Sequence, residues 1–427
     1  MRDSIRVAIL CYRGNMLCGG QGVYLWNLSR ALNQLGHTVE VWTGPPYPHT
    51  LPAQVQVNRV IGHEFWAKWF VGDPLNFLPE NPYESFTPLG FYELASSKLG
   101  FLPEPALFSL RVFKQISARC ADFDIVHDVQ SLGWGLLGIR RLGLPVVSTI
   151  HHPLSIDRRA AFRTDRTLRD LIGTVKFFPI GMQAFVARRL DHILTSSTSG
   201  KKALATDFGV KATQVSNVSN GVDTKIFTPG TERRHSNQIL CVARARDPNK
   251  GVGDLIRAMP LLPKSFQLLL IDSPDESNPA RLWAKDAGCL DRLEIRGNLT
   301  TRELVTAYQR ATVVAVPSHY EGFGLPAVEA MACGAPVVIT SGGALPEIAG
   351  KVAASIVPSG KPEVLANALR NLIESDSAKR AAFGHAGTAS AKSRFSWTAI
   401  AEKTVNIYRQ VIEERRGFPV TTKTSAN

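Results

Sequence analysis

The stretch "HYEGFGLPAVEAMACGAPVVIT", residues 319–340, decides the fold of this chain. It follows the apolar run "VVAVPS" (313–318), opens with a glycine turn, continues in a helical pattern and ends in a second apolar run. Strand, helix and strand in this order are typical of a parallel sheet covered by helices. Two acids, Glu321 and Glu329, flank the turn. Because ligands of such sheets bind outside the carboxyl ends of the strands, we expect a functional site here.

Short apolar runs alternate with helical patterns along most of the chain. The alternation predicts an α/β protein of two doubly wound parallel-sheet domains that face each other across a cleft. The residues that we expect in strands are 5–10, 37–43, 124–129, 145–150 and 191–197 in the first domain, and 238–244, 266–272, 292–297, 313–318 and 335–340 in the second.

The domain boundaries follow from changes in composition. A Pro/Gly/Asn-rich joint near 217–236 separates a first domain, 1–218, from a second domain, 219–395. A last helix is expected at 396–416, before a tail, 417–427, that reads as disordered. Two segments interrupt the rhythm of the first domain: an irregular, aromatic insertion at 44–105 and a basic helical arm at 151–190.

The composition narrows the class of protein. The 427 residues carry a net charge of +13, which favours phosphate-bearing ligands or anionic surfaces. The arm 151–190 concentrates this charge, with eight Arg/Lys against three Asp. Zinc-finger spacing and aromatic residues interleaved with basic ones are missing, so we predict no nucleic-acid partner. The start reads as a buried strand, no run reaches the length of a spanning helix, and the six cysteines are scattered, so we expect a cytoplasmic protein.

Two cations follow the first strand of the second domain. In "ARARDPNKG" (243–251), Arg244 and Lys250 lie on either side of a turn at a strand exit. A guanidinium offers a fork of donors and an ammonium a point charge, so the pair suits a diphosphate. A solvated turn would explain the same residues.

The glycine turn "EGFGLPAVE" (321–329) supplies a second part of the same expected site. Amides of Gly322, Phe323 and Gly324 at a helix start favour an anion. Glu329 can accept hydrogen bonds from ribose hydroxyls, and Glu321 from hydroxyls of a sugar nearer the reacting centre. Capping of the helix would explain one acid, but it leaves the cationic loop unexplained.

Two other motifs are weaker. Gly322, Gly324 and Ala327 form a G-x-G-x-x-A pattern, but a dinucleotide fingerprint belongs to the first strand of a domain. Asp122 and Asp124 form a D-x-D pattern, but it precedes a strand instead of following one, so solvation at the edge of the sheet is the better interpretation. We therefore predict no metal site.

These residues resemble a known family. The chain is similar to the retaining glycosyltransferases of family 4, which have the GT-B fold of two Rossmann-like domains. The resemblance rests on "GGQGVYLWNLSRALNQLGHTVEVWT", "PVVSTIHH", "SNGVDTKIFTP", "EGFGLPAVEAMACGAPVVIT", "SGGALPE" and "FSWTAIAEKTVNIYRQV". Its most specific part is the pair of glutamates, Glu321 and Glu329, separated by seven residues.

The resemblance implies a role for each matching residue. Catalysis would depend on His151, Glu321, Arg244 and Lys250. The donor would be bound by Gly19, Gly20, Arg244, Lys250, Glu321, Gly322, Phe323, Gly324, Leu325 and Glu329. His152 and Arg158 are candidates on the acceptor side. The last helix would cross back to the first domain.

Two local departures from the family pattern have consequences. Arg244 and Lys250 are one residue further apart than is common in the family, so the loop between them is expected to bulge. Where the family usually has His-Asp, this chain has His151-His152-Pro153, which makes His152 a second candidate beside His151.

The implied function is a hexosyltransferase that uses a nucleotide-diphosphate sugar, with UDP or GDP as the first candidates. Without an obvious nucleophilic carboxylate, the implied route is front-face attack, in which the donor phosphate accepts the proton and no metal or cofactor is required. The alternatives are a GT-B sugar-nucleotide epimerase, a phosphorylase, or a non-enzymatic subunit that binds nucleotide sugars. The acceptor would be a lipid-linked or a small soluble molecule, with peripheral contact to an anionic inner membrane face as one hypothesis.

Overall fold

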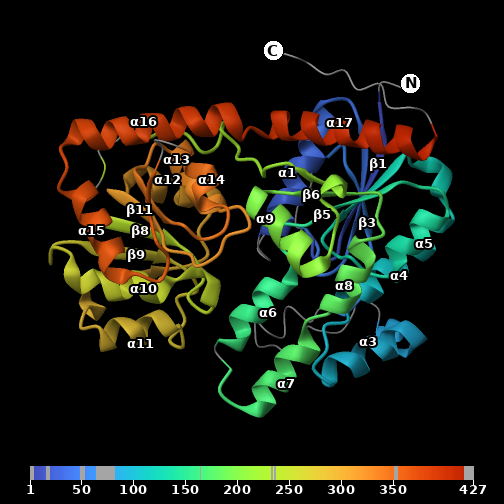
Figure 1. Ribbon diagram of the computed structural model, residues 1–427, viewed down its shortest axis with the longest axis horizontal. Helices are drawn as coiled ribbons and strands as arrows, with labels where there is room; N and C mark the ends of the chain where they lie inside the picture. Colours follow the sequence, from blue (N-terminus) through green and yellow to red (C-terminus); the bar gives the residue numbers. More distant parts are fainter. Residues whose placement is uncertain are drawn as a thin grey trace. The chain divides into compact units, whose positions relative to one another are not determined.

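A computed structural model describes residues 4–15, 20–48, 53–63, 82–163, 165–231, 234, 237–350 and 354–417. They form two compact units (Figure 1). Unit 1 contains the described residues up to Ser196, Gly200–Val218 and the residues from Trp397 onward. Unit 2 contains Ser197–Ser199 and Ser219–Ser396. Gly19, the expected tail beyond residue 417 and residues 64–81 of the insertion lie outside the described residues.

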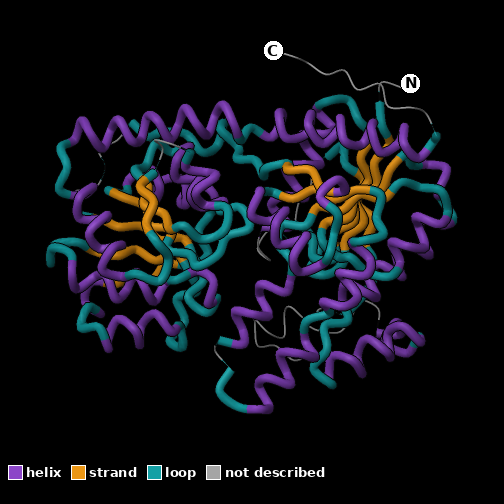
Figure 2. Tube along the Cα trace, viewed as in Figure 1, coloured by secondary structure: helices purple, strands orange, loops and turns teal. Residues whose placement is uncertain are grey.

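Unit 1 is built on a seven-stranded, wholly parallel sheet with the strand order β3-β2-β1-β4-β5-β6-β7. The strands are β1 (Arg6–Cys11), β2 (Thr38–Thr43), β3 (Gln56–Arg59), β4 (Ile125–Val129), β5 (Val146–Thr149), β6 (His192–Thr195) and β7 (Val215–Asn217). Every residue of β4, β5 and β6 is buried, because helices cover both faces of the sheet (Figure 2). This burial explains why each of these strands contains adjacent Ile, Val or Leu residues.

The two faces of this sheet carry different helices. One apolar cluster joins the sheet to α4, α5 and α8, and the other joins it to α1 and α17. α17 presents Ile400, Val405, Tyr408 and Ile412 from one side of a long helix to this second cluster. The helices, in chain order, are α1 (Gly20–Gln34), α3 (Pro88–Lys98), α4 (Glu104–Ser117), α5 (Gly135–Arg141), α6 (Leu154–Phe162), α7 (Leu168–Phe177), α8 (Ile180–Ala187), α9 (Thr198–Ala203) and α17 (Trp397–Arg415).

Unit 2 repeats the plan with six parallel strands in the order β10-β9-β8-β11-β12-β13. This is the strand order of dinucleotide-binding folds, in which the direction of winding reverses between the first and fourth strands, here β8 and β11. The strands are β8 (Gln238–Val242), β9 (Gln267–Ile271), β10 (Leu293–Arg296), β11 (Val313–Val316), β12 (Val337–Thr340) and β13 (Ser355–Val357).

Helices also cover both faces of the second sheet. One cluster holds α12, α13 and α14, and the other holds α10, α11 and α15. α16 packs mainly on α13. The helices are α10 (Val252–Ala258), α11 (Pro279–Asp286), α12 (Thr301–Arg310), α13 (Leu325–Ala332), α14 (Leu345–Ala349), α15 (Pro362–Ile373) and α16 (Ser377–Arg394).

The structure adds regular elements that the sequence did not predict. β3, β7 and β13 lie at or next to sheet edges and have few apolar residues. β3 and α3 fall inside the segment 44–105, so its described part is less irregular than expected. α1 ends before Gly36, which has φ +85°, and the His37 amide donates to the Leu32 carbonyl at 3.1 Å.

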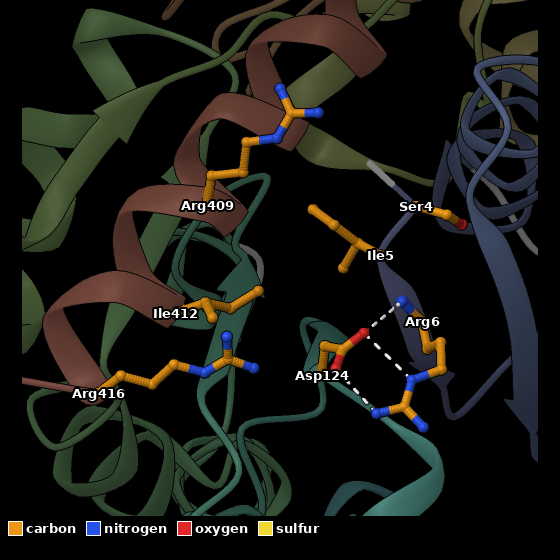
Figure 3. Close-up of a pocket in the computed structure, with 7 residues that line it drawn as sticks. All are labelled: Ser4, Ile5, Arg6, Asp124, Arg409, Ile412 and Arg416. Atoms are coloured by element: carbon orange, nitrogen blue, oxygen red, sulfur yellow. Dashed lines mark hydrogen bonds and ion pairs between the residues drawn. The ribbon is translucent and has the colours of Figure 1, made fainter. Parts of the chain in front are cut away.

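The D-x-D residues lie at the amino edge of the first sheet, away from the strand exits. Asp124 accepts hydrogen bonds from the backbone amide and the guanidinium of Arg6 (Figure 3). It borders a cavity of about 280 Å³ that Arg409 of α17 and Arg416, which directly follows this helix, also line. Asp122 pairs with Arg119 at 2.8 Å. Both acids therefore have arginine partners.

Candidate active site

The predicted residues of unit 2 meet where the winding of the sheet reverses. Lys250 follows β8, and Glu321 follows the neighbouring strand β11. The backbone joins the two loops, because the His319 amide donates to the Asn249 carbonyl at 2.7 Å. Topology thus brings together side chains that are 71 residues apart in the sequence.

Lys250 and Glu321 form an ion pair. The Lys250 Nζ lies 3.0 Å from each carboxylate oxygen of Glu321. Ser318 donates a further hydrogen bond to Oε1 at 2.9 Å. Glu321 is only 7% exposed, so its charge depends on these partners. The Lys250 side chain is 29% exposed and that of Glu321 is 9% exposed, so the lysine is the more accessible member of the pair.

The loop between Arg244 and Lys250 contains a compact turn. Residues Pro248–Lys250 form one turn of 3-10 helix, and the side chain of Asp247 caps it by accepting from the Asn249 amide at 2.9 Å. Gly251 follows with φ +60°, and a β carbon there would lie 2.1 Å from the Pro317 carbonyl oxygen. Only glycine allows this approach of the two loops. Arg244 lies at the exposed start of the turn.

The glycine turn before α13 presents backbone to the same region. Gly324 has φ +101°, a conformation that favours glycine, and Pro326 lies in the first turn of the helix, where proline is favoured. Phe323 packs against Phe395 with ring centroids 5.6 Å apart, so its side chain belongs to the core. Phe323, one of the predicted donor-binding residues, can therefore contact a donor only through its backbone.

Glu329 has a different environment from Glu321. It lies in α13 and accepts a hydrogen bond from the hydroxyl of Tyr308, a fully buried residue of α12, at 2.9 Å. Burial raises the pKa of Glu329 to about 7, while the Tyr308 hydrogen bond opposes the shift. The two glutamates thus have separate partners: Glu321 pairs with the Lys250 ammonium, whereas Glu329 pairs with a phenol and, with a pKa of about 7, is about half protonated at pH 7.

In unit 1 the predicted histidines follow β5. The side chain of Gln130, in the loop after β4, bridges them: its Oε1 accepts from the His151 amide at 2.9 Å, and its Nε2 donates to the His152 carbonyl at 2.8 Å. Gln130 has φ +56°, an uncommon conformation for a non-glycine residue. The buried carboxyl of Asp128 anchors this loop by accepting from the amides of Ser131 and Leu132 at 3.3 and 3.2 Å.

The side chains of the two histidines contact different residues. The ring of His151 meets the edge of Tyr24 of α1, with centroids 5.0 Å apart. Burial, assisted by the charge of His152, lowers the pKa of His151 to about 3, so the ring is neutral at physiological pH. His152 instead pairs with Asp157 of α6 at 2.9 Å.

The other described residues that were predicted in unit 1, Arg158 and Gly20, lie on two helices, α6 and α1. Arg158, on α6, lies over the ring of Phe162, 5.9 Å from its centroid. Gly20 is the exposed first residue of α1. Gly19 lies outside the described residues.

Three polar partners were not predicted from the sequence. Ser318 supports Glu321, Tyr308 supports Glu329, and Gln130 positions the backbone of both histidines. Ser318 is the last residue of the predicted strand 313–318, so its place at a strand exit was the available signal. Tyr308 and Gln130 gave no such signal, because their contacts depend on how separate elements pack.

Two Rossmann-like domains, one with an ion pair and a glycine turn at its strand exits, define the class of GT-B glycosyltransferases. The chain belongs to glycosyltransferase family 4: residues 18–226 match the family described as "Glycosyltransferase Family 4", and residues 223–390 match "Glycosyl transferases group 1". The predictions of family and fold are confirmed, and the protein is a glycosyltransferase. No helix in the described ranges is long and apolar enough to cross a membrane.

Relatives and solved structures agree with this membership. The chain is 37% identical over 413 residues to a protein of Mycolicibacterium hassiacum named "MMP alpha-(1->4)-mannosyltransferase", covering 96% of this chain and 98% of that protein. Sucrose-phosphate synthase from Thermosynechococcus elongatus has a similar fold (TM-score 0.73, 23% identity, 96% of this chain and 100% of that chain). So does HepE of Anabaena in complex with UDP-glucose (TM-score 0.66, 18% identity, 95% and 100%).

Proposed function

We propose that this glycosyltransferase moves a hexose from a nucleotide-diphosphate sugar to an acceptor hydroxyl, with retention of configuration at the anomeric carbon. The observation that carries the proposal is the Lys250–Glu321 ion pair at the reversal of the second sheet. A partly exposed lysine, in the same loop as an exposed arginine and paired with a residue of the glycine turn, suits a diphosphate. The carboxylate that orients this cation can accept hydroxyls of the attached sugar.

Each unit 2 residue then has one role. Lys250 and Arg244 neutralise the diphosphate as it departs, together with the amides of the turn 322–324. Glu321 accepts hydroxyls of the transferred sugar, and Glu329 accepts those of the ribose. Gly20, at the start of α1, and the acceptor-side candidates His151, His152 and Arg158 belong to unit 1. The neutral ring of His151 can donate or accept one hydrogen bond at the acceptor without adding charge.

The proposed reaction is a front-face substitution. The acceptor oxygen forms a bond to the anomeric carbon, the bond from that carbon to the phosphate oxygen breaks, and the hydroxyl proton passes to the departing phosphate oxygen. Neither glutamate is assigned as a nucleophile, because Lys250 and Ser318 hold Glu321 and Tyr308 holds Glu329. Positioning and neutralisation of charge would supply the rate enhancement, without a metal ion.

The relatives support a choice of first substrates. The Mycolicibacterium hassiacum protein is named as a mannosyltransferase that forms an α linkage. An α-linked product from an α-linked donor corresponds to retention, so GDP- and UDP-mannose are the first donors to test. UDP-glucose, the ligand of the HepE structure, is the next.

Thermal unfolding with each nucleotide sugar tests the donor assignment, because a ligand that binds the folded state raises Tm. NMR of the sugar first released, in buffer with EDTA, tests the mechanism. We expect one nucleotide to raise Tm, release of the retained anomer, and the same rate with and without EDTA. A Tm that no nucleotide sugar changes would contradict the donor assignment. An inverted product, or a rate abolished by EDTA and restored by Mg²⁺, would contradict the mechanism.

A further inference from the structure

α7, in the basic arm of unit 1, has an apolar face that the described residues leave exposed. None of its ten residues, all of which the structure describes, is buried. Leu168, Leu171, Ile172 and Val175 are 73%, 41%, 48% and 55% exposed. Their spacing of three, one and three residues places all four on one side of the helix. α7 therefore carries an aliphatic stripe, residues 168, 171, 172 and 175, which is exposed to water.

Local hydrogen bonds stabilise the start of α7 although its apolar face is exposed. Thr167 and Asp170 form a complete capping box at its start, with the Thr167 amide donating to the Asp170 carboxylate at 2.9 Å. A β carbon at Gly173 would meet nothing within 4 Å, so this residue also faces open space. An amphipathic helix gains most of its stability by packing its apolar face. A capped helix without that packing indicates a partner that covers the stripe.

Charge indicates what kind of partner this is. Arg169 and Lys176 are exposed and lie along one side of the stripe, one and eight residues after its first member. Asp170, the acid of this helix, is engaged in the capping box. Over residues 151–190 eight Arg/Lys stand against three Asp. The partner must therefore offer negative charge beside an apolar layer.

Other partners fit less well. A second copy of this chain, placed symmetrically, would bring the same positive face against itself. A single-stranded nucleic acid would use aromatic stacking, whereas the stripe is wholly aliphatic. An aliphatic stripe with cations along its border matches the boundary between acyl chains and anionic headgroups.

We propose that α7 docks this glycosyltransferase onto an anionic lipid surface, with the stripe at the acyl boundary and Arg169 and Lys176 at the headgroup phosphates. The inference is independent of the proposed donor and mechanism. Lipid binding is measured without substrate, and nucleotide release is measured without lipid, so either proposal can fail alone.

The test is co-sedimentation of the full chain with vesicles of phosphatidylcholine, with and without phosphatidylglycerol. We expect binding only to the vesicles with phosphatidylglycerol, and weaker binding at high salt. The double variant Leu171→Gln/Val175→Gln should bind at least about tenfold more weakly, because it removes half of the stripe. Its matched control is Leu282→Gln, an exposed leucine on α11 of unit 2, which should bind like the parent.

A second variant removes the charge and keeps the stripe. Arg169→Gln/Lys176→Gln should weaken binding about tenfold at low salt and reduce its salt dependence, because each cation adds to the attraction. Both positions are exposed, so the fold should persist, which circular dichroism checks. Equal binding of the parent and both variants, or no binding of the parent, would overturn the proposal. So would a dimer that the stripe variant dissolves, because a second copy would then be the partner.

Discussion

The strand exits of the two units share a topology and differ in charge. Both sheets reverse their winding between the first and fourth strands, β1 and β4 in unit 1 and β8 and β11 in unit 2. In unit 2 this position holds an ion pair, Lys250 with Glu321, and an exposed arginine. In unit 1, at the exits of β4 and β5, the hydrogen bonds of Gln130 with His151, and of Thr149 with Tyr24 and His127, join uncharged groups, and the His152–Asp157 pair lies next to them in the chain.

The neutral network is built from buried rings and hydroxyls. The Thr149 hydroxyl forms one hydrogen bond with the Tyr24 hydroxyl at 2.9 Å and another with Nε2 of His127 at 2.7 Å. Nδ1 of His127 is hydrogen-bonded to the hydroxyl of Tyr408 in α17. Burial lowers the pKa of His127 to about 3, as it does for His151. The fold thus fixes where a ligand binds, while the side chains decide its chemistry: a charged leaving group suits unit 2, and an uncharged hydroxyl suits unit 1.

Removal of the unit 2 cation should have the largest effect. We expect Lys250→Ala to lower turnover about 100-fold, because it removes a donor at the departing charge. It also leaves the buried Glu321 carboxylate without its cation. Nucleotide release at saturating donor measures the loss. The control Lys264→Ala removes an exposed lysine of the same unit. Donor-dependent turnover that Lys250→Ala leaves unchanged would contradict the donor assignment.

Removal of the His151 side chain in unit 1 should slow transfer to the acceptor and leave binding of the donor unchanged. We expect His151→Ala to lower transfer about tenfold, the value of one lost hydrogen bond. The Kd of the nucleotide, measured by calorimetry, should stay the same. Because the pKa of His151 is about 3, the parent should show no rate change between pH 5 and 8 that depends on this residue. His385→Ala, at an exposed histidine of unit 2, is the control. A large rise in nucleotide Kd would break the division of roles between the units.

The sequence predicted the charged side of this contrast better than the neutral side. Arg244, Lys250 and Glu321 each follow an apolar strand, and parallel topology brings strand exits to one edge. Their neighbourhood was therefore predictable, although the direct bond between Lys250 and Glu321 was not. The bridge from Gln130 to the histidines depends on a positive φ and on packing between loops, which no local pattern encodes.

The presence or absence of a local sequence pattern also explains which strands were predicted and which were missed. Strands buried on both faces contain adjacent Ile or Val residues and were predicted within one or two residues at most ends. β3 ("QVNR") is a polar strand at a sheet edge, and β13 ("SIV") has three residues, so neither has enough apolar sequence to be recognised.

The pH dependence of donor binding tests how the two glutamates of unit 2, Glu321 and Glu329, differ. The pKa of Glu329 is about 7, raised from 4.5 mainly by burial. If only the carboxylate accepts ribose hydroxyls, its active fraction rises about tenfold from pH 6 to pH 8. The KM for the donor should therefore fall by about the same factor as pH rises, and Glu329→Gln should flatten the profile. A KM of the parent that is constant over this range would remove Glu329 from the donor site.

This raised pKa also affects folding, with a sign that can be checked. Because the folded protein holds the Glu329 proton more tightly than the unfolded chain, the favourable contribution to stability is complete below about pH 4.5 and is lost as pH rises through about 7. Glu329→Gln cannot ionise, so its Tm relative to that of the parent should increase from pH 5 to pH 8. Donor binding and stability thus respond to pH in opposite directions at one carboxyl group.

The smallest expected effect comes from the partner of that group. Tyr308→Phe removes the hydroxyl that hydrogen-bonds Glu329 and lowers its pKa. The midpoint of the KM profile should therefore move to higher pH, with donor KM near pH 7 raised about threefold and kcat unchanged. Tyr83→Phe, at an exposed tyrosine of unit 1, is the control. A merely structural tyrosine would lower Tm without moving the midpoint, because a loss of packing changes no proton affinity. A shifted midpoint would show that Tyr308 positions and tunes the acid of the unit 2 site.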